Sequence, residues 1–163
     1  MTNQEGVVDY DPRWPGDFEK IRAALPAEAV AIHVGSTSVP GLAAKPIIDV
    51  DVVVLRPDGV PAMVALIEAA GWSHEGDLGI PGREAFEPRA DLPTHHLYVV
   101  VEGSAPHLDH VDFRDYLRAH PEEAERYAAL KRTLAPLLAT DRTAYLEGKS
   151  DLITEIIARA RRG

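Results

Sequence analysis

The sequence predicts one α+β domain, because the pattern of its first half differs from that of its last third. Two apolar runs typical of strands, 29–34 and 47–55, lie on either side of a loop with glycine and proline. A run at 95–102 is the clearest later strand, and after residue 107 the pattern changes to successive helices. A mixed first half followed by a helical remainder indicates an α+β fold. With 163 residues, the chain is long enough for one full hydrophobic core.

Helical spacing, strand runs and breaker residues place the elements in order. Residues 1–12 are polar and are expected to form an arm at the start of a single domain that spans 1–163. Asp58 is expected to cap the second helix, and Thr140 with Asp141 the last one. The expected helices are 14–25, 60–70, 108–119, 121–139 and 141–162, and the expected strands are 29–34, 47–55, 72–75, 83–88 and 95–102.

Composition excludes several classes of function. The absence of cysteine removes disulfides, thiolate catalysis and cysteine-ligated metal centres. A net charge of −9 argues against a general nucleic-acid binder, so no nucleic-acid partner is expected. The N-terminal residues lack the basic and apolar regions of a signal peptide, and no apolar run approaches membrane-spanning length. We therefore expect a cytoplasmic protein without a membrane partner.

The strand predicted at 47–55 carries two acidic residues, Asp49 and Asp51. Residues two apart on a strand lie on the same face, so both carboxylates point the same way. The rest of this strand is isoleucine and valine, which predicts burial. Two buried carboxylates on one side need a neutral or cationic partner, and a divalent cation is the simplest one because hard cations prefer oxygen ligands. Asp49 and Asp51 are therefore candidate ligands for Mg²⁺ or Mn²⁺.

A Gly35-Ser36 turn precedes this acidic strand and directly follows the strand at 29–34. A Gly-Ser turn lets phosphate oxygens approach backbone N–H groups closely. Paired carboxylates can hold a metal ion that bridges such phosphates and offsets charge at the phosphorus that is transferred. Gly35 and Ser36 are therefore candidate triphosphate-binding residues.

Two stretches of this sequence resemble the GrpB family: HVGSTSVPGLAAKPIIDVDVVV, and FRDYLRAHPEEAERYAALKRTLA followed by Tyr145 and Lys149. The resemblance runs from about residue 11 to residue 157. That family is generally assigned to the nucleotidyltransferase superfamily by its Gly-Ser and acidic-strand motif. The resemblance implies a nucleotidyltransferase-like mixed sheet with flanking helices and a C-terminal helical segment.

The resemblance also implies candidate functions. The leading one is an Mg²⁺-dependent nucleotidyltransferase that moves a nucleoside monophosphate from a nucleoside triphosphate to a small-molecule acceptor. The alternative is a catalytically degenerate fold that binds nucleotide or phosphate, or assists folding, because GrpB-like domains also occur fused to dephospho-CoA kinase, a possible partner. Metal-assisted hydrolysis of a phosphate ester would use the same acids.

The superfamily mechanism needs three acids, and this sequence matches two of them, Asp49 and Asp51. On the strand at 95–102, His96 lies on the face opposite to the apolar residues and can point at the acids as a metal ligand or base. Glu84 and Glu87 on the preceding short strand are alternative third acids. A third carboxylate at the pair would favour the enzyme, whereas its absence would favour the binding domain. His33 is expected to bond to a backbone group.

Basic side chains from the rest of the chain are candidate phosphate-binding residues. Lys45 lies in the loop between the two motifs, and Arg114 shares a helical face with Arg118, although either arginine can instead pair with surface acids such as Asp115. Lys131 and Lys149 each lie on an otherwise inward-facing helical stripe, where an ammonium must reach solvent or meet an anion. A cationic wall facing the acidic strand is expected, unless each lysine pairs with a buried carboxylate.

Overall fold

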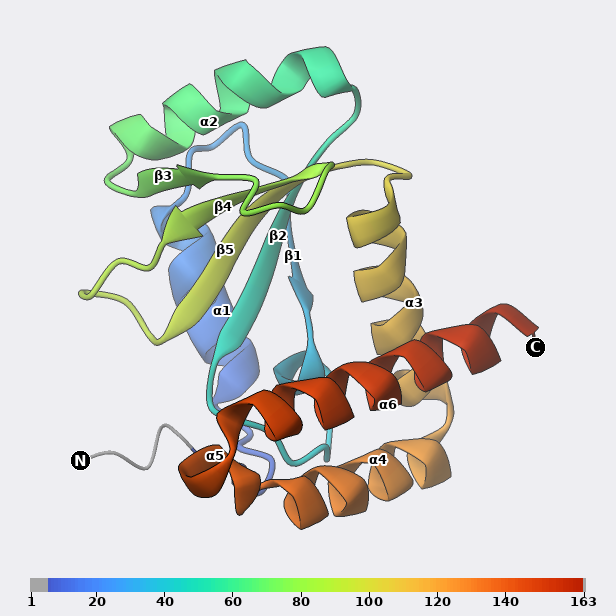
Figure 1. Cartoon of the computed structure of the whole chain (residues 1–163). Coiled ribbons are helices and arrows are strands. Elements are labelled where there is room, and N and C mark those ends of the chain that lie inside the picture. Colours follow the sequence, from blue (N-terminus) through green and yellow to red (C-terminus); the bar gives the residue numbers. More distant parts are fainter. Residues whose placement is uncertain (1–5, 163) are drawn as a thin grey trace.

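In the computed structural model, which describes residues 6–162, a five-stranded sheet forms the centre of the protein (Figure 1). Its strands are β1 (Ala31–Val34), β2 (Ile48–Val54), β3 (Ser73–Gly76), β4 (Arg83–Glu87) and β5 (His95–Val101). They lie in the order β1-β2-β5-β4-β3, with β2 and β5 parallel and the other neighbours antiparallel. The predicted α+β fold with a mixed sheet is confirmed.

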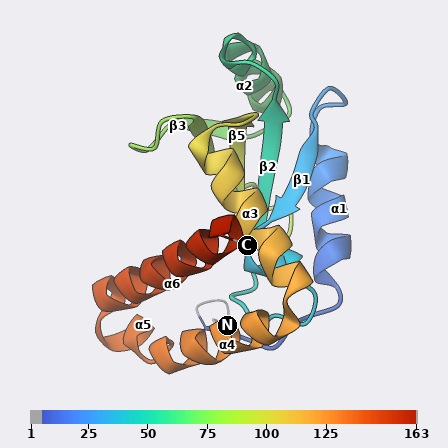
Figure 2. The ribbon, with the colours of Figure 1, turned by 90° about the vertical axis from the view of Figure 1, so that its right-hand side faces the viewer.

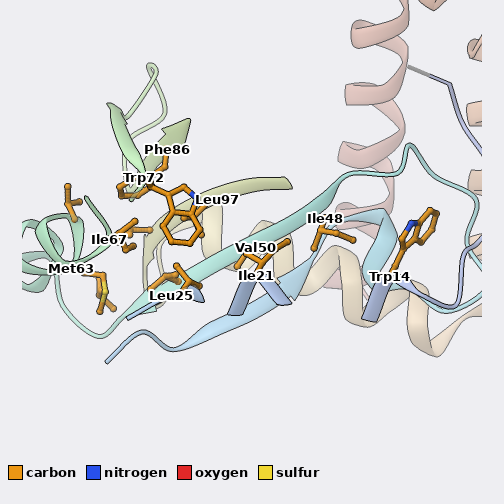
Figure 3. Packing of buried hydrophobic residues seen from close by; sticks show 14 of the residues in the cluster. Trp14, Ile21, Leu25, Ile48, Val50, Met63, Ile67, Trp72, Phe86 and Leu97 are labelled. Atoms are coloured by element: carbon orange, nitrogen blue, oxygen red, sulfur yellow. The ribbon is translucent and has the colours of Figure 1, made fainter. Parts of the chain in front are cut away.

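One face of the sheet packs on α1 (Trp14–Ala24) and α2 (Val60–Ala69), and this layer holds the main hydrophobic core. Figure 3 shows side chains of α1, α2, β2 and β5 packed together there, including Ile21, Val50, Ile67 and Leu97. The even-numbered residues of β2 and the odd-numbered residues of β5 supply this face, as period two requires. The odd-numbered residues of β2, which include the two aspartates, therefore face the other way.

The opposite side of the sheet is covered by the helical C-terminal part, as Figure 2 shows for α6 relative to α1. This part consists of α3 (Ala105–Ala119), α4 (Pro121–Leu134), the short α5 (Leu137–Thr140) and α6 (Arg142–Arg162). A second core cluster joins these helices to the loop after β1, and within it Phe113 and Tyr127 meet edge to face with ring centroids 5.4 Å apart. A Cβ on Gly148 of α6 would lie 3.0 Å from Leu134, so glycine permits the close approach of α4 and α6.

Two expectations about helices were wrong in detail. Residues 121–139 do not form one helix: α4 ends at Leu134 and α5 begins at Leu137, because Pro136 lacks the N–H that would continue the helical hydrogen-bond pattern. Asp58 does not cap α2, whose N-cap is Gly59. Instead Asp58 pairs with Arg56.

The helix α3 begins at Ala105, three residues before the expected start, with a proline in its first turn. The N-terminal arm is anchored within its described part, since Val8 forms an antiparallel bridge with Ala44. Of the two residues expected to cap the last helix, Asp141 accepts a hydrogen bond from the Ala144 N–H, whereas the Thr140 hydroxyl donates to the Pro136 carbonyl. Among the described residues, no helix is long and apolar enough to cross a membrane.

Candidate functional site

The two aspartates of β2 lie on the sheet face that the helices α3 and α6 cover. Asp49 pairs in register with His96 of β5, and Asp51 pairs with Tyr98, so all four side chains share that face. Asp51 is fully buried, whereas the side chain of Asp49 is 30% exposed. The prediction that both carboxylates share one face of a buried strand is confirmed, with Asp49 at the more open end.

Each aspartate has a histidine partner. The Nδ1–H of His96 donates to Oδ1 of Asp49 over 2.9 Å, and the Nδ1–H of His110, on α3, donates to Oδ2 of Asp51 over 2.6 Å. Burial lowers the pKa of His110, but the hydrogen bond to Asp51 and the charges of both aspartates outweigh it and raise the pKa above the usual 6.5. Both carboxylates are therefore bonded to imidazoles; the sequence predicted such a partner in His96 but not in His110.

His110 is a residue that sequence reasoning missed. It lies on the α3 face that also carries Pro106, Phe113 and Leu117, all of them buried. A histidine on such an apolar stripe was the available signal. Its partner lies 59 residues away in the sequence, so only the packing of α3 on β2 identifies the contact.

The turn after β1 lies directly against Asp49. Gly35 has φ +75°, and a Cβ at this position would lie 2.1 Å from Oδ2 of Asp49, so only glycine fits. A short 3-10 turn, Ser36–Ser38, follows, and the hydroxyl of Ser38 donates to the Gly35 carbonyl. Gly35, Ser36 and Asp49 thus form one wall of the site.

Lys131 of α4 reaches this wall from below the sheet. It is 1% exposed, its ammonium donates to Oγ of Ser36 over 3.2 Å, and it lies 4.9 Å from the centre of the Tyr127 ring. Among residues 6–162, no carboxylate lies within ion-pair distance of Lys131 or Lys149. Burial, followed by the charge of Lys149, lowers the pKa of Lys131 from 10.5 to about 7, with Asp49 opposing and Lys45 adding to the shift. The alternative in which each lysine pairs with a buried acid is therefore wrong.

These residues border a cavity of about 530 Å³ between the sheet and the helices. Its polar lining includes the Gly35-Ser36 turn and side chains of β2, β4, β5, α3 and α6: Asp49, Arg83, His96, Tyr98, His110 and Lys149. Its apolar lining comes from the loop before β4, from α3 and from α6: Ile80, Phe113, Ile153 and Ile157. Five of the nine predicted site residues therefore line this cavity. Asp51 contacts the lining through His110, and Lys131 contacts it through Ser36.

Two predicted cations have other contacts. Arg114 donates to the carbonyl of His33 over 3.2 Å and pairs with Asp115, and it is not part of the cavity lining. Arg118 donates to the Ser38 carbonyl rather than pairing with a surface acid. Both arginines hold the turn after β1 on α3. Lys45 lies 5.7 Å from the centre of the Tyr145 ring and near enough to Lys131 to affect its pKa.

Neither candidate for a third acid reaches the pair. Glu84 pairs in register with Val99, whose side chain is in the main core, and its carboxylate bonds to His74 over 2.8 Å. Glu87 is exposed at the far end of β4, opposite Ser73. Across the part of the chain that the structure describes, no three His, Asp or Glu side chains form a metal-binding cluster.

The two aspartates nevertheless fit a hard cation. Each has one oxygen bonded to a histidine and one left over, and Oδ1 of Asp51 is buried without a hydrogen-bond partner. Mg²⁺ is commonly bound by one or two carboxylates, with phosphate oxygens and water completing the octahedron. Asp49 and Asp51 can therefore hold Mg²⁺ together with a phosphate, but these two side chains alone do not complete its coordination.

Two further histidines, His33 and His95, have structural contacts. His95 lies on the core side of β5, where its Nε2 accepts a hydrogen bond from Trp72, so only one of the adjacent pair faces the aspartates, as expected. His33 bonds to the hydroxyl of Thr37 and stacks on Phe18, rather than bonding to a backbone group. Burial, above all, lowers the pKa of His33 to about 4.

Solved structures similar to this chain support the fold. The crystal structure of the conserved protein GrpB from Enterococcus faecalis superposes with a TM-score of 0.79 at 33% identity, covering 94% of this chain and 96% of that one. A structure of the Cid1 poly(U) polymerase, titled as MgGTP bound, superposes with a TM-score of 0.50 at 12% identity, covering 77% of this chain and 42% of that one. At that identity the likeness is one of fold alone, and it confirms the predicted nucleotidyltransferase-like architecture.

Curated relatives extend beyond this chain. It is 35% identical over 161 residues to the UPF0157 protein YqkA of Bacillus subtilis, covering 96% of this chain and 47% of YqkA. It is 39% identical to the UPF0157 protein PA4798 of Pseudomonas aeruginosa, covering 94% of this chain and 66% of that protein. A dephospho-CoA kinase of Mycolicibacterium paratuberculosis matches at 26% identity, covering 94% of this chain and 45% of the kinase. The model of the family described as GrpB protein matches residues 6–159, and the chain belongs to the GrpB family.

Proposed function

We propose that this domain binds the triphosphate of a nucleotide together with Mg²⁺, in the cavity between β2 and the helices α3 and α6. The observation that carries the proposal is Lys131. It is 1% exposed, and its hydrogen-bond partner is the neutral hydroxyl of Ser36. A buried ammonium without a carboxylate is costly, by several kcal/mol, and a phosphate bound beside Ser36 would supply the missing charge.

The arrangement of charge favours a metal-bound phosphate over a bare one. An anion held by Ser36, Lys131 and Lys149 would lie beside Asp49, because Asp49 touches the Gly35 backbone. A phosphate and a carboxylate repel each other unless a cation lies between them. Mg²⁺ at Asp49 and Asp51 would offset the phosphate charge and orient the chain of phosphates.

The rest of the cavity supports a nucleotide as the source of the phosphates. Phe113 offers apolar surface beside the polar residues, as small-molecule sites usually do. The fold supports the same class, since the structure of Cid1 to which it is similar is titled as MgGTP bound. The nucleotide and Mg²⁺ remain proposals for this chain.

Calorimetry tests the proposal directly. The domain is titrated with ATP, GTP, CTP and UTP in the presence of Mg²⁺ or Mn²⁺, alongside Lys131→Met, Asp51→Asn and the control Lys20→Met, at an exposed lysine of α1. We expect metal-dependent binding of at least one nucleotide, weakened at least tenfold by Lys131→Met and by Asp51→Asn and unchanged by Lys20→Met. Absence of nucleotide binding with either metal would refute the proposal.

Nucleotidyl transfer is the second candidate, favoured by the two Asp–His pairs. An acceptor hydroxyl would form a bond to the α-phosphorus as the bond to pyrophosphate breaks, and His96 would take the hydroxyl proton while Asp49 holds its ring. The lack of a third carboxylate makes this candidate second. Asp49→Asn and Asp51→Asn should each abolish pyrophosphate release without unfolding the domain, and near-normal turnover in either variant would exclude the mechanism. Release without any acceptor would indicate hydrolysis.

Association with dephospho-CoA kinase is also a proposal. It is supported by the kinase that matches at 26% identity over 45% of its own length. A pull-down of purified dephospho-CoA kinase with this domain tests it, and no retention at micromolar concentrations would argue against it.

A further inference from the structure

One cation of the cavity has no part in the proposed phosphate contacts. Arg83 of β4 pairs in register with Val100, two positions from the Ala85–Tyr98 pair, so it lies on the same sheet face as Tyr98 and Asp51. Its guanidinium carbon is 4.3 Å from the centre of the Tyr98 ring. Its Nε is buried without a hydrogen-bond partner, and among the described residues it forms no ion pair.

A role as a partner for the aspartates does not account for Arg83. Asp49 and Asp51 are bonded to His96 and His110, and Arg83 is within ion-pair distance of neither carboxylate. The contact with the Tyr98 ring holds the guanidinium in place. An arginine fixed in this way, with an unsatisfied buried N–H, is prepared for an oxyanion.

Arg83 and the lysines reach the cavity from different sides of the β2–β5 pair. The sheet order puts β2 and β5 between β1, which leads into Ser36, and β4, which carries Arg83. Three strand spacings amount to about 14 Å. Lys131 and Lys149 approach from α4 and α6 on the Ser36 side. The cavity therefore has two cationic ends with the aspartates between them.

We infer that the Arg83 end binds a second ligand, a small acid whose carboxylate or phosphate head meets Arg83 and whose apolar body packs on Ile80 and the isoleucines of α6. Carboxylate and phosphate share the planar pair of oxygens that a guanidinium fork recognises. The apolar lining of Ile80, Ile153 and Ile157 lies in the same cavity. This inference rests on the proposed nucleotide site. It names the chemical class of the acceptor to which the nucleoside monophosphate would be transferred.

Matched six-carbon probes test the inference. Hexanoate, hexyl phosphate, hexanol and hexylamine are titrated into the domain and into Arg83→Met, Arg83→Lys and the control Arg56→Met, at an exposed arginine that pairs with Asp58. We expect one or both acids to bind at millimolar concentration and the alcohol and amine not to bind. Affinity for the acid should fall at least tenfold in Arg83→Met, fall less in Arg83→Lys, and stay unchanged in Arg56→Met. Binding of hexanoate alone assigns a carboxylic acid, and binding of hexyl phosphate alone assigns a phosphate monoester.

Two further readouts separate this inference from the nucleotide site. Arg83→Met should keep metal-dependent nucleotide affinity within about threefold, and Lys131→Met should lose the nucleotide while keeping the acid. In the wild-type domain, the Nε–Hε resonance of Arg83 should shift with the acid and not with hexanol, which needs no variant to fold. The inference is overturned if neither acid binds, if the Arg83 resonance does not move, or if acid binding survives Arg83→Met.

Discussion

Replacing Lys131 by methionine should stabilise the protein while removing its phosphate site. Methionine has a similar unbranched length and no charge to bury. Folding lowers the pKa of Lys131 from 10.5 to about 7 through burial, so at pH 7 the unfolded chain holds a proton there that the folded chain half releases. At about 1.4 kcal/mol per pH unit, this shift corresponds to about 5 kcal/mol of lost stability.

Some of this gain is offset in the variant. Methionine loses the hydrogen bond to Ser36 and the contact of the ammonium with the Tyr127 ring, together worth about 2 kcal/mol. We therefore expect Lys131→Met to raise the free energy of unfolding by about 3 kcal/mol at pH 7, or the melting temperature by about 10 °C. The difference in free energy of unfolding between the variant and the wild type should be widest at and below pH 7. It should close as the pH rises towards 10.5, because wild-type stability increases where the unfolded state binds more protons.

Urea unfolding at pH 7 and at pH 9.5 measures both effects. Lys20→Met, at an exposed lysine that lies 3.9 Å from Asp17, is the control and should change stability by about 0.5 kcal/mol or less at either pH. A Lys131→Met variant that is less stable than wild type at pH 7, or whose difference from wild type does not shrink at high pH, would refute the view of Lys131 as an uncompensated buried cation.

Two further predictions follow from the turn after β1. Gly35→Ala should lower the free energy of unfolding by about 3 kcal/mol or more in urea and abolish nucleotide binding, because φ is +75° and the new Cβ would overlap Asp49. The control Gly16→Ala, where nothing lies within 4 Å of the new Cβ, should be neutral or stabilising. A fully stable Gly35→Ala variant would contradict the geometry. The lowered pKa of His33 means that stability falls as the pH drops from 6.5 towards about 4, since the unfolded state binds the proton first. At pH 5 this loss of stability is about 2 kcal/mol, or about 1 kcal/mol after screening by solvent at a half-buried ring. His33→Gln, which can still bond Thr37, should remove the loss. Equal acid sensitivity of wild type and variant in the same unfolding assay would exclude His33 as the source.

Local patterns predicted most of the fold and half of the site. Period two on β2 placed Asp49 and Asp51 on one face, and the same rule separated His96 from His95. Helical stripes predicted that Lys131 points inward. The prediction of one helix over 121–139 was wrong for a local reason as well, because Pro136 interrupts the helical hydrogen bonds between α4 and α5.

Alternation along strands and helices thus determined, from the sequence alone, which residues face inward. Only the tertiary structure decided what they meet: His110 on Asp51, Ser36 on Lys131, the His33 carbonyl on Arg114 and His74 on Glu84. These contacts depend on how α3 docks on the sheet, on how α4 packs against the loop after β1, and on the register of β3 and β4. Docking and register are set by the packing of whole surfaces far apart in the chain, and no local period encodes them.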